Sequence, residues 1–289
     1  MIRSRNNPQV RALRRLRNAH TRKQSDLLLL EGRHLVDAAA TARLTFRHLL
    51  ATPDFRAAHM ELIRRLEHRS GTAAALIDPD RLREQADADA PQGIAALVEP
   101  PAGWHSAEGE TLVLPSGLHL YVDGVQDPGN LGAMARSAEA AGAAAGTARP
   151  SQPRALRASA GSLLRIPVWT DVRVDHVQTR ITWLVLAAQG NKDGASLPVA
   201  SLFTAETPDP KVPADLIATD AILAVGNESK GLSRPVLDRA DMALWIPTAR
   251  AVESLNAAVA ASLALFELQR LRGEFRCSRT GSPRRPDRT

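Results

Sequence analysis

The stretch Ile222-Leu-Ala-Val-Gly226-Asn-Glu228-Ser-Lys-Gly-Leu-Ser233 joins a short apolar run to a glycine turn with polar side chains. A short apolar run bounded by turn residues is typical of a buried strand, and glycine allows a ligand to approach the backbone. Two other apolar runs lead into loops of the same kind. One loop reads Asp123-Gly-Val-Gln-Asp-Pro-Gly-Asn130, with a helix expected to begin at Asn130, and the other runs from Pro247 to Ser254-Leu255-Asn256.

Strand-like and helical patterns alternate around these loops. We expect strands over 118–122, 181–187, 221–225 and 242–246, and helices over 131–141, 154–164, 234–240 and 255–271. This alternation predicts an α/β fold with a mainly parallel sheet that is covered on both faces. Ligands of such sheets bind beyond the carboxyl ends of the strands, so the loops over 123–130, 226–233 and 247–256 form the candidate site.

The chain is expected to divide near residue 100. Residues 1–99 are interpreted as a small α/β domain with a basic helix at 9–17, strands at 27–30, 49–51, 73–77 and 94–98, and helices at 33–42 and 54–69. Pro100, Pro101 and Gly103 open a predicted linker over 100–117. A second domain is expected over 118–275, followed by a basic, disordered tail over 276–289.

Composition limits the class of protein. Of the 289 residues, 44% are apolar and 24% charged, which is typical of a folded chain and excludes disorder throughout. The apolar runs are far shorter than the roughly 18 residues of a membrane span, so we expect no contact with a membrane. Cys277 is the only cysteine, which excludes an internal disulfide. With no signal-peptide pattern at the start, we expect a cytoplasmic protein.

Basic residues gather at the start of the chain. Eight lie within residues 1–23 without any acidic residue, and five of them are candidate RNA contacts: Arg3, Arg5, Arg11, Arg14 and Arg15. Such a run favours a polyanion partner, although a solvated arm is the alternative. Because only 3% of residues are aromatic, we expect recognition through phosphates and RNA shape and not through stacked bases.

Several common site chemistries are disfavoured. In the segment 226–231 the lysine precedes its glycine, which is not the order of a nucleotide-triphosphate loop. No G-x-G-x-x-G follows a strand, so a dinucleotide fold is disfavoured. His176 is the only histidine after residue 119, and we therefore expect neither a histidine triad nor a metal site in the second domain.

The motifs resemble those of the SpoU (TrmH) branch of the SPOUT superfamily, which are RNA ribose 2′-O-methyltransferases. Matching residues occur in the family's order: Asn130 with Arg136, then Gly226-Asn227-Glu228, then Ser254-Leu255-Asn256. The resemblance covers residues 118–271 and includes Arg154-Ala-Leu-Arg-Ala-Ser-Ala-Gly161. It extends more weakly to Glu31-Gly-Arg-His-Leu-Val36 and to residues 92–98, which look like the family's small RNA-binding domain.

The resemblance implies a dimeric α/β domain whose C-terminal part forms a trefoil knot. It also implies S-adenosylmethionine bound against the backbone of Gly226, Ile246 and Leu255. The implied catalytic residues are Asn130, Arg136, Glu228, Ser254 and Asn256. A guanidinium is a poor base, so we expect Arg136 to hold an RNA phosphate and polarise the 2′-hydroxyl, while phosphate, water or Glu228 takes the proton. For Asn130 the alternative is a helix N-cap, and for Glu228, Ser254 and Asn256 it is hydrogen bonding within loops and caps. The segment after Gly142 is shorter than in the family.

The function expected from this resemblance is S-adenosylmethionine-dependent ribose 2′-O-methylation of structured RNA. Ribosomal RNA is favoured because an RNA-binding domain precedes the methyltransferase domain. The alternatives are a transfer-RNA methyltransferase and a non-catalytic RNA-binding or ribosome-assembly factor on the same fold. A homodimer is expected because the last helix places Leu255, Val259, Leu263 and Phe266 on one stripe.

Overall fold

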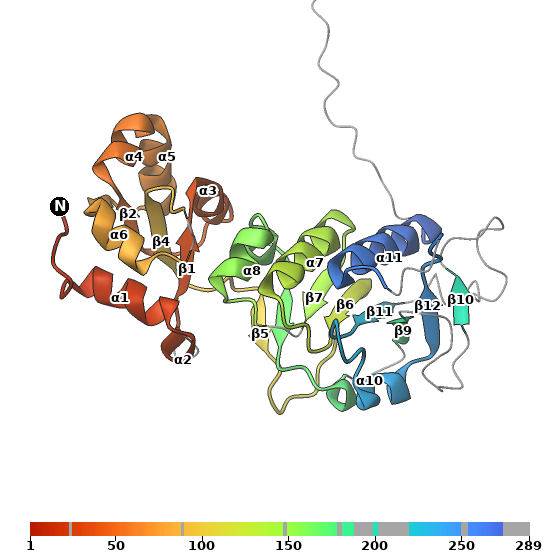
Figure 1. Cartoon of the computed structure of the whole chain (residues 1–289). Coiled ribbons are helices and arrows are strands. Elements are labelled where there is room, and N and C mark those ends of the chain that lie inside the picture. The colour runs from red at the N-terminus through yellow and green to blue at the C-terminus, as the bar shows by residue number, and fades with distance from the viewer. Residues whose placement is uncertain are drawn as a thin grey trace, which may run out of the picture.

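Two β-sheets organise the chain, one in each half (Figure 1). The computed structural model describes residues 1–22, 25–87, 90–146, 149–177, 181–187, 199–201, 220–249 and 254–273. The predicted tail over 276–289 lies outside these residues. The predicted knot stays a prediction, since residues 250–253 of the last loop are not among those described.

The first half contains a four-stranded sheet in the order β1-β4-β2-β3. Its elements are α1 (Pro8–Arg17), α2 (Ala19–Arg22), β1 (Leu28–Glu31), α3 (Arg33–Thr41), β2 (Phe46–Ala51), α4 (Pro53–Ala58), α5 (Met60–Ser70), β3 (Ala74–Leu76), α6 (Pro79–Gln85) and β4 (Ile94–Val98). β4 pairs antiparallel with β1 and β2, whereas β2 and β3 are parallel. The small α/β unit predicted from the sequence is confirmed.

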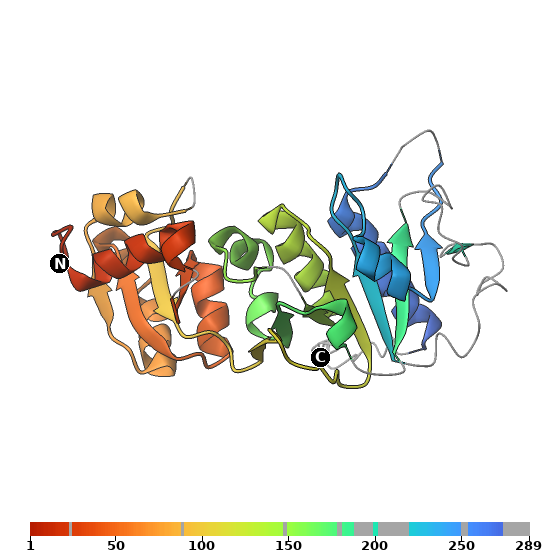
Figure 2. The same cartoon turned by 90° about the horizontal axis from the view of Figure 1, so that it is seen from below.

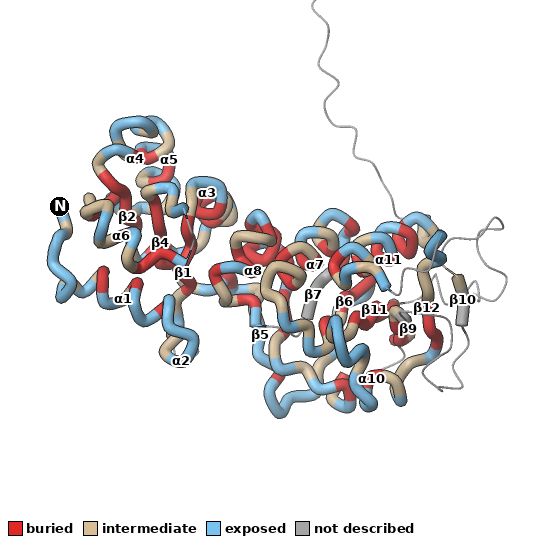
Figure 3. Tube along the Cα trace, viewed as in Figure 1, coloured by how far each residue is buried: buried red, intermediate tan, exposed pale blue. Residues whose placement is uncertain are grey.

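Alternating side chains of this sheet enter two separate cores. Leu29 of β1 packs with Val10, Leu13 and Leu16 of α1, all almost fully buried, whereas Leu30 faces the core beneath α3 and α5. The predicted helix at 9–17 is therefore confirmed, with one apolar stripe inside and its arginines outside. In Figure 3 the strands of this half are largely buried, whereas α1 alternates between buried and exposed residues.

The second half contains an eight-stranded sheet in the order β10-β12-β9-β11-β6-β7-β8-β5, in which every pairing is parallel. Its elements are β5 (Trp104–Ser106), β6 (Leu118–Val122), α7 (Pro128–Ala140), β7 (Ala144–Gly146), α8 (Pro153–Ala158), η1 (Ser162–Leu164), β8 (Val168–Thr170), η2 (Val174–His176), β9 (Thr182–Ala187), β10 (Val199–Ser201), β11 (Ala221–Val225), α10 (Arg234–Arg239), β12 (Met242–Trp245) and α11 (Ala257–Leu271). The predicted parallel sheet is confirmed.

Helices cover both faces of this sheet, as predicted. α7, α8 and α11 lie on one face and α10 on the other (Figures 1 and 2). Along β11, Leu223 and Val225 face the core under α7 and α11, while Ile222 and Ala224 face the core that includes Val236 of α10. This two-sided burial explains why β11 is apolar at every position.

The predicted linker over 100–117 is partly wrong. Trp104–Ser106 form β5, which pairs in register with Val168–Thr170 of β8. The Trp104 indole Nε1 also donates to the carbonyl of Leu163 at 2.7 Å. Prolines and a glycine around this strand gave it the composition of a linker, although these three residues complete the edge of the second sheet.

Three predicted helices are divided, shortened or lengthened, and a fourth, expected at 255–271, begins at Ala257 because Asn256 is its N-cap, which leaves Leu255 outside the helix. The helix expected at 54–69 is divided into α4 and α5 at His59, whose backbone leaves the helical region. The helix expected at 154–164 ends at Ala158, because Ala160 and Gly161 both have positive φ. The third helix, α7, begins at Pro128 and not at Asn130, since Asp127 is its N-cap and accepts from the Gly129 amide at 2.9 Å.

Candidate active site

The site is built at the carboxyl ends of the neighbouring strands β6 and β11. After β11 the chain turns at once, and the backbone groups of Asn227 and Gly231 exchange two hydrogen bonds of 2.9 Å. The side-chain Oδ1 of Asn227 accepts from the amides of Ser229 and Lys230, each at 2.9 Å. These bonds close the turn and hold Glu228 at its exposed tip.

Three motif residues from distant segments meet beside this turn. Asn130, in the first turn of α7, donates through Nδ2 to Glu228 Oε1 at 2.8 Å. Its Oδ1 accepts from Asn256 Nδ2 at 3.1 Å. The residues 130, 228 and 256 form one hydrogen-bonded unit, which we call the amide–carboxylate cluster. The sequence-based expectation that these loops converge is confirmed for this cluster.

Each member of the cluster is fixed by its own local structure. Asn256 is the N-cap of α11, where its Oδ1 accepts from the amides of Ala258 and Val259. Asn130 is not the N-cap of α7, so its whole amide group is available for the cluster. Asn227 Nδ2 donates to the carbonyl of Gly124 at 2.8 Å, which ties the turn after β11 to the loop after β6.

Glu228 is held as a carboxylate. Burial alone raises the pKa of this group, but hydrogen bonds from Asn130 and from backbone amides, including that of Gln126, leave its pKa below the ordinary value. A carboxylate with a lowered pKa is a weak proton acceptor. Its hydrogen bonds to Asn130 and to the Gln126 amide show that Glu228 orients the loops of the site.

Arg136 lies farther along α7 and is exposed. Within the described residues it has neither a hydrogen bond nor an ion pair, so its guanidinium is available to a ligand. Arg154 of α8 also lies near the start of α7, where its Nη2 is 3.4 Å from Asp127 Oδ1. The structure thus leaves Arg136 outside the amide–carboxylate cluster but on the helix that carries Asn130.

The three residues expected to contact a cofactor through their backbone, Gly226, Ile246 and Leu255, lie in different surroundings. Gly226 directly precedes the closed turn, and Leu255 directly precedes Asn256; both are half-buried. Ile246 follows β12 and packs against the main core. Ser254 is exposed, and among the described residues no hydrogen bond ties it to the cluster.

The need for glycine at position 226 has a different cause from the one predicted. A Cβ there would lie 2.4 Å from the Gly231 carbonyl carbon and 2.6 Å from the Leu232 nitrogen. The space beside Gly226 is therefore filled by the turn's own backbone and is not open to a ligand. Glycine at this point allows the turn to close, which in turn places Glu228.

Two acidic residues of the site were missed by the sequence analysis. Asp127 caps α7, and the pair Asp127-Pro128 was a usable signal for a helix start. Asp123 Oδ2 accepts from the Ser233 amide at 2.6 Å, which joins the loops after β6 and β11 a second time. No local pattern predicts that second contact.

The arginines of the first half lie on the outer side of α1 and before it. Arg3, Arg11 and Arg15 are exposed and have no ion pair among the described residues. Arg5 differs, because its guanidinium pairs with Glu84 of α6 at 2.8 Å. Arg14 donates to the carbonyl of Arg5 at 3.3 Å. Four of the five predicted RNA contacts thus have no ion pair among the described residues, and only Arg5 is neutralised by a carboxylate.

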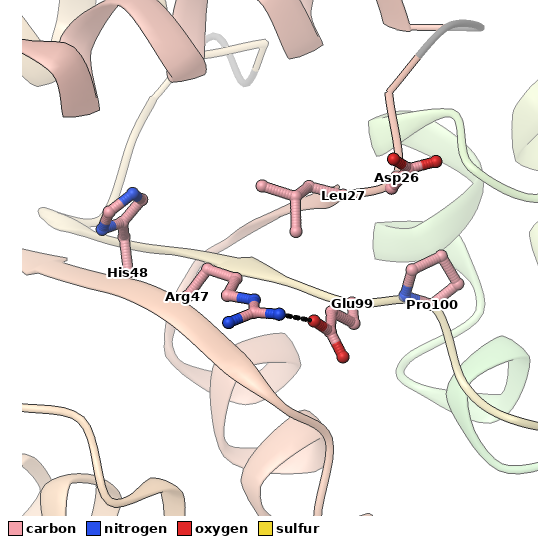
Figure 4. Close-up of a pocket in the computed structure, with 6 residues that line it drawn as sticks. All are labelled: Asp26, Leu27, Arg47, His48, Glu99 and Pro100. Carbon is pink, nitrogen blue, oxygen red and sulfur yellow. Dashed lines mark ion pairs between the residues drawn. The ribbon is translucent and has the colours of Figure 1, made fainter.

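A separate pocket lies in the first half, away from the motifs (Figure 4). It is lined by Asp26, Leu27, Arg47, His48, Glu99 and Pro100. Arg47 is paired with Glu99, and burial lowers the pKa of His48. With its arginine neutralised and two acidic residues in its wall, this pocket is a poor site for phosphate.

The described residues meet neither the requirements of a metal site nor those of a membrane-spanning helix. Among the described residues, His, Cys, Asp and Glu side chains do not gather in threes that could hold a metal ion. The same residues include no helix with the length and apolar character that crossing a membrane requires.

Comparison with known proteins follows the same division of the chain. The SpoU rRNA Methylase family matches residues 117–266, and the MRM3-like substrate binding domain matches residues 7–96. An uncharacterized tRNA/rRNA methyltransferase of Synechocystis is 32% identical, with 93% of each chain covered. The 23S rRNA (guanosine(2553)-2′-O)-methyltransferase RlmP of Bacillus subtilis is 29% identical and covers 93% of this chain and 98% of its own.

A solved structure shares the whole arrangement. The SpoU methyltransferase AviRb from Streptomyces viridochromogenes, in complex with the cofactor AdoMet, aligns with a TM-score of 0.72 and 25% identity. The alignment covers 92% of this chain and 98% of that one. The two-part architecture is thus shared along nearly the whole chain.

Proposed function

Because the chain belongs to the SpoU rRNA methylase family, we propose that it transfers a methyl group from S-adenosylmethionine to a ribose 2′-hydroxyl in ribosomal RNA. The observation that carries this proposal is the amide–carboxylate cluster, in which all three motifs meet at the carboxyl edge of a parallel sheet. Ligands of open α/β sheets bind at that edge. The name of RlmP, a 23S rRNA 2′-O-methyltransferase, supports ribosomal over transfer RNA.

The residues present suit an adenosyl cofactor. The turn after Gly226 offers main-chain groups at the end of β11, and the ionised Glu228 is compatible with a nearby positive sulfur. The backbone of Gly226, Ile246 and Leu255 would hold the cofactor, which supplies an activated methyl group when bound. The chain itself must then align the ribose and help the hydroxyl lose its proton.

Arg136 is the residue that we assign to the RNA. A free guanidinium on the helix that carries Asn130 is suited to hold a phosphate oxygen by two hydrogen bonds. In this position it would fix the ribose and polarise its 2′-hydroxyl. Glu228 keeps Asn130 and the turn in place by its hydrogen bond, and the proton passes to phosphate, water or this carboxylate.

The proposed activity predicts a specific product. The purified protein, incubated with methyl-labelled S-adenosylmethionine, should label an unmodified 23S rRNA transcript at a position that then resists alkaline hydrolysis. Transfer-RNA transcripts serve as the comparison. Labelling of transfer RNA alone would show that the substrate is wrong, and cofactor binding without labelling of any RNA would favour the non-catalytic alternative.

The exposed arginines on α1 and before it predict salt-dependent binding. Replacing Arg3, Arg11 and Arg15 together by alanine should weaken transcript binding and reduce the slope of log K against log salt by about 2, because each phosphate contact contributes about 0.7 to 0.9. Arg5→Ala is the matched control, since Arg5 already pairs with Glu84 and should change the slope less. Filter binding over a salt series measures both. An unchanged slope would assign the arginines to a solvated arm.

The last helix supports the proposal of a homodimer. Val259, Leu263 and Phe266 of α11 are 40–49% exposed, whereas Ala258, Ala261 and Ala264 are buried against the chain's own core. The small residues therefore serve packing within one chain, and the exposed surface of the larger ones suits a second copy of the chain. An exposed apolar stripe of this kind marks an interaction surface.

Light scattering tests this surface. The wild-type protein should have twice the chain mass of 31.1 kDa at micromolar concentration, and Leu263→Glu should give a monomer. Val113→Glu is the matched control, because Val113 is 66% exposed but lies outside α11. A monomeric wild-type protein would contradict the dimer.

A further inference from the structure

The junction between the two halves contains an ion-paired cluster outside the site described above. Arg157 of α8 lies between two carboxylates of the first half: its Nη1 is 2.7 Å from Glu31 Oε2, and its Nη2 is 2.8 Å from Asp87 Oδ2. The Asp87 amide donates to the other oxygen of Glu31 at 2.9 Å. One guanidinium of the second half thus joins two segments of the first.

Burial makes this contact specific to one arrangement of the two halves. Only 7% of the Glu31 side chain and 27% of the Arg157 side chain are exposed. A buried carboxylate that loses its partner is left uncompensated, so rotation of one half against the other is opposed. By contrast, an ion pair on the surface would tolerate such movement.

Close packing at the same junction supports this reading. Gly161, three residues after α8 ends, has φ +90°, and a Cβ there would lie 2.6 Å from the Ala38 Cβ of α3. The two halves therefore meet at a point with no room for a methyl group. Glu31, Asp87 and Ala38 belong to three different segments of the first half. All three segments therefore contact α8 or the residues just after it.

The junction is also connected rigidly to the site. α8 packs closely on α7, where a Cβ on Gly132 would lie 2.4 Å from the Ala155 carbonyl and 2.6 Å from the Ala158 Cβ. α7 carries Asn130 and Arg136. Figures 1 and 2 both show α8 beside the first half, with α7 next to it. The first half thus packs closely against the end of α8, and α8 packs closely against α7, which carries the site residues.

We propose that Arg157 is a positioning residue for methyl transfer, because its ion pairs with Glu31 and Asp87 hold the RNA-binding half at one orientation to the helix that carries Asn130 and Arg136. RNA held on α1 then presents its ribose at a fixed distance from Arg136. This role rests on the proposed function. It differs from stabilisation alone, because it predicts a loss of transfer without a loss of RNA binding.

The test compares the full-length wild-type protein with Arg157→Ala and Arg157→Lys, using an unmodified 23S rRNA transcript. Arg157→Ala should lower kcat/KM for methylation about tenfold or more, since small misplacements of a reacting group are costly. The dissociation constants for transcript and for S-adenosylmethionine should not change, because α1 and the cofactor loops are untouched. Arg157→Lys, which keeps the charge, should recover part of the rate.

Two further variants complete the design. Arg165→Ala is the matched control: Arg165 makes a two-bond ion pair with Glu139 inside the second half, at 2.6 and 2.7 Å, and should leave the ratio of rate to RNA affinity unchanged. Asp87→Asn keeps the pair between Arg157 and Glu31 and covers the case in which Arg157→Ala does not fold. Asp87→Asn should also lower kcat/KM for methylation, but by less than Arg157→Ala does.

The outcomes separate the two proposals. The positioning role would be contradicted if Arg157→Ala and Asp87→Asn both kept the wild-type kcat/KM. It would also be contradicted if Arg157→Ala lost transcript affinity and methylation rate to the same extent. Small-angle scattering adds a readout without RNA, and Arg157→Ala should increase the radius of gyration. A wild-type protein that binds the transcript but does not methylate it would contradict the proposed function, and the scattering would still show whether Arg157 fixes the orientation.

Discussion

Arg136→Ala should reduce methyl transfer to the 23S rRNA transcript by about 100-fold or more, the usual loss when a group that stabilises developing charge is removed. Cofactor affinity should stay within a few-fold, since Arg136 is exposed on α7 and forms no hydrogen bond or ion pair with the turn after β11 among the described residues. Single-turnover rates and calorimetric titration with S-adenosylmethionine give the two quantities.

Two controls sharpen the result for Arg136. Arg136→Lys keeps the charge but loses the planar fork, and should recover only part of the rate. Arg173→Ala removes another exposed arginine, paired with Asp175 at 2.8 Å beside η2, and should have no effect. Loss of S-adenosylmethionine binding in a folded Arg136→Ala protein would show that the assignment of Arg136 to the RNA is wrong.

Gly226→Val should have the opposite profile, with cofactor affinity lost first. Its Cβ would overlap the Gly231 and Leu232 backbone, so the turn must open and Glu228 must leave Asn130. Overpacking of this kind costs about 1–3 kcal/mol, which corresponds to a loss of roughly tenfold or more in affinity. Gly226→Ala should act in the same direction, because the Cβ alone produces the overlap.

Gly103→Ala is the control for the glycine series. A Cβ there would meet its nearest atom, the Cα of Pro167, at 3.6 Å, an ordinary contact. Calorimetry and thermal melting on both variants separate loss of the site from loss of the fold. Undiminished S-adenosylmethionine affinity in Gly226→Val would show that closure of this turn is not needed for the cofactor.

The parts of the fold that could be predicted are those with strong hydrophobic patterns. Strands β4, β6 and β11 begin and end at the predicted residues, because each is a run of five residues between clear turn signals. β5, β7 and β8 were not predicted; each has three residues, and β7 contains only alanine and glycine. Such strands are defined by their neighbours in the sheet and not by their own composition.

The candidate site was predictable as a set of loops but not as a network. Order along a parallel sheet brings residues 130, 228 and 256 to one edge, and the structure confirms this. Which side chain donates to which depends on the exact start of α7, set by Asp127 and Pro128 two residues before the predicted position. The pairing of Arg5 with Glu84 also joins separate segments, and no local pattern indicates it.

The amide–carboxylate cluster also has a consequence for synthesis of the chain. Asn130 is 98 residues from Glu228 and 126 residues from Asn256, so its partners are translated long after it. Chains generally fold from the N-terminus as they leave the ribosome, at about 5–20 residues per second. The first half can therefore fold while its own ribosome is still translating the second. Methyl transfer becomes possible only after the start of α11 has emerged, 126 residues after Asn130.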